Sequence, residues 1–132
     1  MTADSSALIA AFGGWHRRHG PALDALAEVA DLATHAELEA YSVLTRLPKP
    51  HRAPAELAAE YLSGGYPGRR LVLPAARRNG FVTRLADRGI SGGMVYDALI
   101  AATAAEHGLR LLTCDKRAER TYERLGVAYE LI

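Results

Sequence analysis

One stretch, residues 96–115, constrains the fold of this chain most, because it encodes a helix, a tight turn and a strand in succession. Asp97 lies near the start of the helix. Gly108 follows its last turn, where a left-handed backbone costs glycine least. Residues 109–113 (Leu-Arg-Leu-Leu-Thr) predict a short buried strand that leads into Asp115. One acid therefore lies at a helix start and another at the C-terminal end of a strand, the edge at which α/β sheets bind ligands.

The same alternation of strands and helices runs through the whole chain. The candidate strands are residues 1–3, 31–34, 69–73, 109–113 and 127–132. Helical patterns cover residues 7–12, 22–30, 35–47, 54–62, 74–87, 96–107 and 116–124. Helices between successive strands predict parallel neighbours, so residues 1–132 are expected to form one three-layer α/β/α domain. Its central sheet is predicted to be mainly parallel, with about five strands.

Composition excludes several classes of protein. The net charge of +1 gives no general attraction for nucleic acid, so such a ligand would need a local basic patch. The single cysteine, Cys114, excludes an intrachain disulfide and a cysteine-based zinc site, and it fits a reducing compartment. No apolar run reaches the roughly 18 residues of a membrane span, and the first residues do not have a signal-peptide pattern. We expect a cytoplasmic protein with no membrane partner.

Four acidic residues are candidates for one shared site. Asp4 and Asp115 each follow a candidate strand, and in a parallel sheet such positions share an edge. Asp97 is in the first turn of its helix, and Glu39 is midway along the helix after the second strand. Carboxylates that meet there would raise one another's pKa values unless a cation lay between them. Oxygen ligands suit Mg²⁺ or Mn²⁺, which can lower the pKa of a bound water and stabilise charge on a phosphate.

Each acid also has a simpler structural interpretation. Asp4 could be only a helix cap, although Ser5 or Ser6 is the expected cap, and Glu39 could lie on a solvated helix face. The spacing alone does not decide whether Glu39 points toward the other acids. A further reading is that Glu39 and Asp115 are plain surface charges in an unrelated α/β domain.

Four motifs, in order, resemble those of the PIN-domain proteins of the VapC toxin type, the ribonuclease half of a bacterial toxin–antitoxin pair. They are Asp4-Ser5-Ser6-Ala7-Leu8, residues 39–48 (Glu-Ala-Tyr-Ser-Val-Leu-Thr-Arg-Leu-Pro), residues 92–101 (Gly-Gly-Met-Val-Tyr-Asp-Ala-Leu-Ile-Ala) and residues 112–118 (Leu-Thr-Cys-Asp-Lys-Arg-Ala). The similarity covers nearly the whole chain. It departs from the family at the start, where only three residues precede Asp4, so either the first strand is short or the true start lies upstream.

The resemblance implies a PIN-like fold and a metal-dependent endoribonuclease toxin of a type II toxin–antitoxin system, with Mg²⁺ or Mn²⁺ as cofactor. The implied catalytic residues and metal ligands are Asp4, Glu39, Asp97 and Asp115. Ser6 and Thr113 would be neighbouring hydroxyls that orient the ligands. The implied reaction is in-line attack by a metal-activated water on an RNA phosphodiester.

The resemblance also implies partners. They are a cognate VapB-type antitoxin, an RNA substrate such as tRNA or rRNA, and a second copy of the chain in a homodimer. Operator DNA would be bound only through the antitoxin. The alternative is a non-cleaving RNA- or antitoxin-binding module that acts in operon autoregulation. The presence of all four acids favours the nuclease.

Basic residues near the acids are candidate RNA contacts. Arg46 follows Glu39 on one helix face, and Lys116 and Arg117 follow Asp115 directly. Ordinary surface ion pairing is an equally good explanation for all three. Residues 15–20 (Trp-His-Arg-Arg-His-Gly) combine an aromatic with basic groups and could suit a nucleic-acid backbone. A solvated loop before the next helix is the favoured interpretation of that segment.

Other hydrolase motifs are absent from the sequence. His35 is four residues before Glu39, but no HExxH pattern is present, so a zinc hydrolase is not supported. The five histidines are given no role, and His35 is interpreted as a polar residue at a helix start. Ser91 is not in a G-x-S-x-G elbow, and the glycines of residues 89–93 do not form a phosphate-binding loop.

Overall fold

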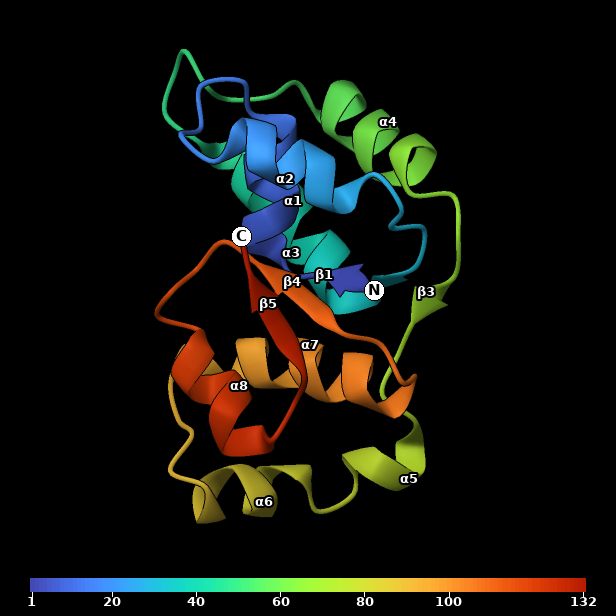
Figure 1. Ribbon diagram of the computed structural model, residues 1–132, viewed down its shortest axis with the longest axis vertical. Helices are drawn as coiled ribbons and strands as arrows, with labels where there is room; N and C mark the ends of the chain where they lie inside the picture. The colour runs from blue at the N-terminus through green and yellow to red at the C-terminus, as the bar shows by residue number, and fades with distance from the viewer.

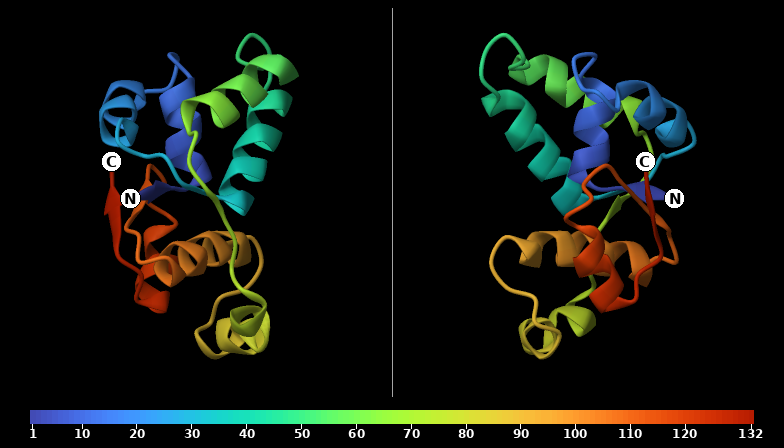
Figure 2. Two further views of the ribbon diagram at one scale, coloured as in Figure 1. Left: turned by 90° about the vertical axis from the view of Figure 1, so that its right-hand side faces the viewer. Right: turned by 60° about the vertical axis from the view of Figure 1, so that its left-hand side comes forward.

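A computed structural model describes all 132 residues and places a short sheet between two groups of helices (Figure 1). The strands are β1 (Thr2–Ala3), β2 (Leu32–Ala33), β3 (Arg70–Leu71), β4 (Leu111–Thr113) and β5 (Tyr129–Leu131). The helices are α1 (Ser5–Phe12), α2 (His19–Leu26), α3 (Thr34–Arg46), α4 (Ala55–Gly65), α5 (Ala75–Arg78), α6 (Phe81–Asp87), α7 (Met94–Glu106) and α8 (Glu119–Leu125). The views in Figure 2 show α1–α4 on one side of the strands and α7 and α8 on the other, with α5 and α6 beyond them. No helix is long and apolar enough to cross a membrane.

All strand pairs are parallel, as predicted, and the three-layer α/β/α class is confirmed. The pairing is divided, however, into a three-stranded sheet, β1-β4-β5, and a two-stranded sheet, β2-β3. Between β1 and β2 the hydroxyl of Thr2 donates to the carbonyl of Asp31 at 2.8 Å, in place of a backbone ladder. Two-residue strands offer few backbone groups, so one side-chain bond can replace a ladder there.

Three predicted helix boundaries were wrong. The single helix expected over residues 74–87 is two helices, α5 and α6, because Gly80 adopts a left-handed backbone with φ of 76° between them. The helix expected over residues 22–30 begins earlier, at His19, and ends at Leu26. The last helix begins at Glu119, so the residues directly after Asp115 form a turn rather than a helix.

The expected left-handed turn after α7 is confirmed, because Gly108 has a φ of 67°. The main core lies around β1 and β4, where Leu8, Ile100, Leu111 and Leu112 are almost fully buried. Each such aliphatic side chain contributes about 1.5–3 kcal/mol through burial. Alanines on α1, α3 and α7 share this core and let the helices approach the short strands closely. Residues that follow β1 and β4 are therefore attached directly to the main core.

Strand register brings the predicted site together. Ala3 of β1 lies opposite Leu112 of β4, so Asp4 and the residues after Thr113 leave the sheet at one edge. The backbone N–H of Asp4 donates to the carbonyl of Leu112 at 3.0 Å. The segments that carry Glu39 and Asp97, α3 and α7, pack against each other beside this edge.

Candidate active site

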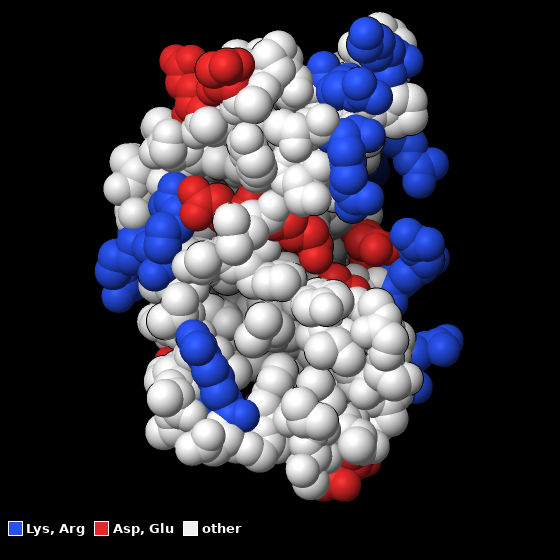
Figure 3. All heavy atoms as spheres, turned by 180° about the vertical axis from the view of Figure 1, so that it is seen from behind, with Lys and Arg blue, Asp and Glu red and all other residues white.

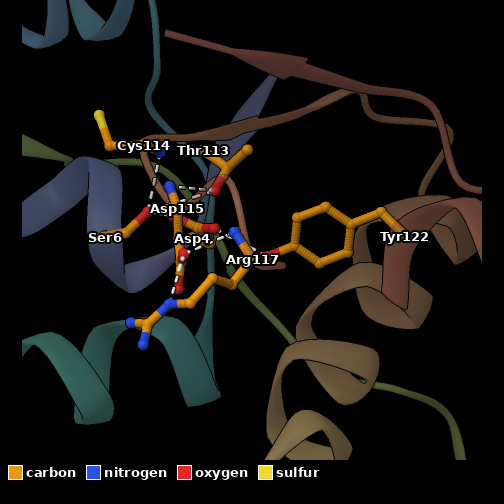
Figure 4. A network of polar contacts seen from close by, with 7 residues as sticks. All are labelled: Asp4, Ser6, Thr113, Cys114, Asp115, Arg117 and Tyr122. Carbon is orange, nitrogen blue, oxygen red and sulfur yellow. Dashed lines mark hydrogen bonds and ion pairs between the residues drawn. The ribbon is translucent and has the colours of Figure 1, made fainter. Parts of the chain in front are cut away.

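Asp4 is the anchor of the site and is also the cap of α1. Its carboxylate accepts a hydrogen bond from the backbone N–H of Ala7 at 3.0 Å, so Asp4, and not the expected Ser5 or Ser6, caps the helix. Ser6 Oγ donates to Asp4 Oδ1 at 2.6 Å, and Tyr122 Oη donates to Asp4 Oδ2 at 2.7 Å (Figure 4). The side chain is buried, which raises the pKa of Asp4, and these hydrogen bonds oppose the rise.

Ser6 and Thr113 connect the start of α1 to the end of β4. Their hydroxyl oxygens are 3.2 Å apart, and Ser6 Oγ accepts from the backbone N–H of Cys114 at 2.8 Å. Thr113 Oγ1 accepts from the backbone N–H of Asp115 at 3.0 Å. Figure 4 shows this chain of contacts running from Asp4 to Asp115. The two hydroxyls thus position both predicted ligands, Asp4 and Asp115.

The carboxylate of Asp97 interacts electrostatically with the other three predicted acids. It is half-buried in the first turn of α7, and burial is the main cause that raises its pKa to about 6. The charges of Asp4, Glu39 and Asp115 raise the pKa further. The structure therefore brings the four predicted acids close enough to interact.

Glu39 projects from α3 toward the start of α1. Ser5 Oγ donates a short hydrogen bond to Glu39 Oε1, and His35 Nε2 lies 3.7 Å from Oε2. The question left open by the sequence, whether Glu39 faces the site or only solvent, is answered by these contacts. They place its carboxylate beside the residue that follows Asp4.

The donor set suits a hard divalent cation, because the clustered acids supply only oxygen. Their mutual repulsion, visible in the raised pKa of Asp97, is the condition that a cation would relieve. No group of three or more His, Cys, Asp or Glu side chains is arranged to hold a metal ion as the side chains now stand. Both oxygens of Asp4 accept hydrogen bonds, and Glu39 is bonded to Ser5. An oxygen that accepts one hydrogen bond keeps a further lone pair, so Asp4 could bind a cation where it stands and the other carboxylates would turn toward it.

The sequence did not indicate a role for Tyr122, which comes from α8 and is fully buried. Its ring points at Asp4 (Figure 4), and burial, followed by the charge of that carboxylate, raises the pKa of the phenol, so it remains a hydrogen-bond donor. A tyrosine in the helix after the last acid was a weak signal, because a buried phenol needs a polar partner. Ser5 was considered only as a cap, although it bonds Glu39.

His35 also does more than begin a helix. Its ring stacks on Tyr96, with ring centroids 5.1 Å apart and an angle of 6° between the planes. Tyr96 precedes Asp97 in α7, so this pair joins the helices that carry Glu39 and Asp97. Stacking of this kind contributes to the packing of these two helices.

The three predicted RNA contacts occupy different surroundings. Arg117 Nε lies 3.4 Å from Asp115 Oδ1, with 93% of the arginine side chain exposed. Lys116 and Arg46 are exposed and form no ion pair or side-chain hydrogen bond, so surface ion pairing does not explain them. On the face shown in Figure 3, acidic side chains lie across the middle of the molecule and basic side chains flank them.

Comparison with known proteins gives a consistent result. Residues 1–124 match the PIN domain family. The chain is 44% identical over 129 residues to Ribonuclease VapC40 of Mycobacterium tuberculosis, in both strain H37Rv and strain CDC 1551, covering 98% of this chain and 96% of that protein. Ribonuclease VapC27 of strain H37Rv is 45% identical over 98 residues, which are 74% of this chain and 71% of that protein.

The fold is a parallel α/β/α arrangement, and acids from separate segments gather at one edge of its sheet. The sequence is similar to VapC40 along almost the whole chain. The chain belongs to the PIN-domain family and, within it, to the ribonuclease toxins of the VapC type. The resemblance drawn from the four sequence motifs is confirmed.

Proposed function

We propose that this protein is a metal-dependent endoribonuclease, the toxin of a type II toxin–antitoxin system. The observation that carries the proposal is the gathering of four carboxylates at one sheet edge, where burial and the charges of the other three acids together raise the pKa of Asp97 to about 6. Excess negative charge is unsuited to bind RNA directly, and it is suited to bind a divalent cation. The relatives named as ribonucleases support the choice of RNA as substrate.

In this proposal Asp4, Glu39 and Asp97 hold Mg²⁺ or Mn²⁺, and Asp115 completes the site. When bound, the cation would lower the pKa of a coordinated water and stabilise negative charge on the phosphate. The protein supplies orientation. Ser6 and Tyr122 donate to the carboxylate of Asp4, Thr113 accepts from the backbone N–H of Asp115, and all three belong to elements that contribute to the core.

Arg46, Lys116 and Arg117 are proposed to contact the RNA backbone around the acids. Replacing Lys116 and Arg117 together with glutamine should weaken RNA binding and reduce its salt dependence, because fewer counterions are released. Arg46→Gln should have a smaller effect, since it is the more distant along its helix. Titration of labelled RNA at several salt concentrations measures both changes. Unchanged binding in both variants would remove these residues from the proposal.

The proposed partners follow from the same family. They are a VapB-type antitoxin, an RNA substrate such as tRNA or rRNA, and a second copy of the chain. Operator DNA would be bound through the antitoxin, and the site of action would be the cytoplasm. The names of the relatives support the antitoxin and the RNA.

The decisive experiment is cleavage of a mixed tRNA and rRNA pool by the purified protein. Discrete fragments are expected with Mg²⁺ or Mn²⁺, and none with EDTA or with Asp97→Asn. The matched control is Asp87→Asn, because Asp87 is an exposed aspartate of α6 with no bonded partner. This control should cleave like the wild type.

Each outcome has a clear meaning. Fragments that persist in Asp97→Asn would contradict the proposed site. No cleavage by a folded, metal-loaded protein free of antitoxin would instead support the non-cleaving binding module.

A further inference from the structure

A pocket of about 480 Å³ opens beside the four acids. It is lined by Ser6, His16, Arg17, Asp115, Lys116 and Arg117, among others. We propose that this pocket binds a phosphate of single-stranded RNA next to the one that is cleaved, with Arg17 and Lys116 as its main contacts. This inference rests on the proposed function, because it takes the four acids as the point of cleavage.

The charge of the pocket is the first argument. Arg17 and Lys116 are exposed and make no ion pair, whereas Arg117 is close to the one carboxylate of the pocket, that of Asp115. Two unneutralised cations therefore face one cavity. A phosphodiester carries one negative charge and fits such a cavity better than a neutral ligand does.

The loop that carries Arg17 is held in place, which is the second argument. Trp15 packs so closely over Gly13 that a Cβ atom there would lie 2.6 Å from the Trp15 ring. Arg18 Nε donates to the carbonyl of Ile132 at 3.0 Å, which attaches the loop to the chain end after β5. His16 Nδ1 accepts from the backbone N–H of Arg18 at 3.0 Å. The basic group of Arg17 thus extends from a segment that several contacts hold in place. Residues 15–18 form an exposed loop before α2, as the sequence interpretation favoured.

Continuity with the acids is the third argument, and it favours RNA over an acidic peptide. Ser6 lines the pocket and donates to Asp4, so one side chain belongs to both the pocket and the predicted site. Trp15 remains 42% exposed on the same loop. Basic groups beside an exposed aromatic ring are the combination that binds single-stranded nucleic acid.

Binding by a cleavage-deficient protein tests the inference. Fluorescence anisotropy would follow a labelled 12-nucleotide single-stranded RNA with the Asp97→Asn protein, at several salt concentrations. Adding Arg17→Gln and Lys116→Gln together should weaken binding about tenfold near 0.1 M salt and lower the slope of log K against log salt by about 1.4. The matched control adds Lys49→Gln and Arg120→Gln, which remove the same charge from exposed residues outside the pocket. The control should stay within about twofold of its parent, as expected for charges outside the binding path.

A chemical double-mutant cycle locates the bound phosphate. Once a cleaved sequence is known, single uncharged methylphosphonate linkages are placed at each position around the cleaved bond. A methylphosphonate at one position, on one side of the cleaved bond, should weaken RNA binding by the Asp97→Asn parent. The same methylphosphonate should have no further effect once Arg17→Gln is added. Additive losses at every position would overturn the inference.

The remaining outcomes separate this inference from the proposed function. Weaker RNA binding by the pocket variant, in a protein that shows no metal-dependent cleavage, supports the pocket and contradicts the nuclease. Cleavage by the wild type, with the pocket variant binding RNA like its control, overturns the pocket alone. Loss of antitoxin binding without loss of RNA binding would also overturn it, because an acidic peptide would then be the occupant.

Discussion

Asp4 and Asp97 face the same edge of the sheet, but the protein holds them in opposite ways. Asp4 is 3% exposed, and both of its oxygens accept hydrogen bonds from Ser6, Tyr122 and the backbone of Ala7. Asp97 is only half-buried, has no hydrogen-bond donor to its side chain, and lies in the field of three other acids. Burial raises the pKa of both carboxylates, but only Asp4 has hydrogen bonds that oppose the rise and fix its position, whereas the charges of its neighbours raise the pKa of Asp97 further.

This difference indicates a division of labour in the proposed metal site. The Asp4 side keeps its geometry without a cation, because each oxygen already has partners from the core. The Asp97 side needs a cation to offset the repulsion. The fixed carboxylate of Asp4 and the unpaired negative charge around Asp97 together favour the binding of a cation over an ion pair within the protein.

Substituting the two aspartates should give the largest and most contrasting effects. Asp4→Asn and Asp97→Asn should each lower cleavage by about 10³-fold or more, because each removes a charged ligand worth several kcal/mol. Without metal at pH 7, Asp4→Asn should lower the free energy of unfolding by about 1–2 kcal/mol, through loss of the cap and the buried hydrogen bonds. Asp97→Asn should raise it. Urea unfolding with EDTA measures both, and equal signs would contradict the comparison.

Tyr122→Phe tests the Asp4 side of the site, where hydrogen bonds fix the carboxylate. It removes a buried donor to Asp4, so we expect a loss of about 1–3 kcal/mol in unfolding free energy and a 10- to 100-fold loss of metal affinity. The matched control is Tyr129→Phe, whose hydroxyl contacts only Glu119 and Glu123. Thermal unfolding and Mn²⁺ titration provide the measurements. A control that lost as much metal affinity would show that general packing, not the bond to Asp4, is responsible.

The pH dependence of the free energy of unfolding tests the Asp97 side of the site. Because the folded state raises the pKa of Asp97 from 3.8 to about 6, it binds the proton more tightly than the unfolded chain does. The free energy of unfolding without metal should therefore fall as pH rises from about 4 to about 6. A shift of this size corresponds to ~3 kcal/mol, and solvent screening of a half-buried group reduces it to ~1–2 kcal/mol.

Urea titrations in EDTA across this pH range measure the fall. The groups that face Asp97 are Asp4, Glu39, Asp115 and Arg117. The fall should become smaller in Asp97→Asn, where the raised pKa of Asp4 still contributes, and it should be reversed by saturating Mg²⁺, which binds the ionised form. A fall that persisted unchanged in the variant would assign the titration to another group.

Ser5→Ala should have the smallest effect of the four. The variant removes the donor to Glu39 Oε1 and frees that carboxylate without removing a charge. Metal affinity should fall by about tenfold or less, at the low end for a residue that orients a ligand. Mn²⁺ titration provides the measurement, with Ser63→Ala as the control, because Ser63 bonds only to the carbonyl of Ala59 in α4. A loss of metal affinity as large as that of Tyr122→Phe would show that Glu39, like Asp4, depends on its hydrogen bond for its position.

Local pattern predicted the parts of the site that depend on position in an element. Asp115 follows a strand, Asp97 lies in the first turn of a helix, and Gly108 turns the chain between them. These features depend on backbone preferences within a few residues. The break at Gly80 and the turn after Asp115 were missed, because the helical pattern continues through both and the left-handed backbone of Gly80 was not predicted.

The sequence by itself determined the α/β class and the parallel direction of neighbouring strands, and it singled out four acids as candidates for one site. Only the tertiary structure decided that Tyr122 reaches Asp4, that Ser5 holds Glu39 and that the loop of Arg17 lies beside Lys116. Periodicity reports which face of an element is buried, but it carries no information on which distant side chain lies opposite. Contacts between residues up to 118 positions apart depend on how the short strands pair and how the helices pack over them.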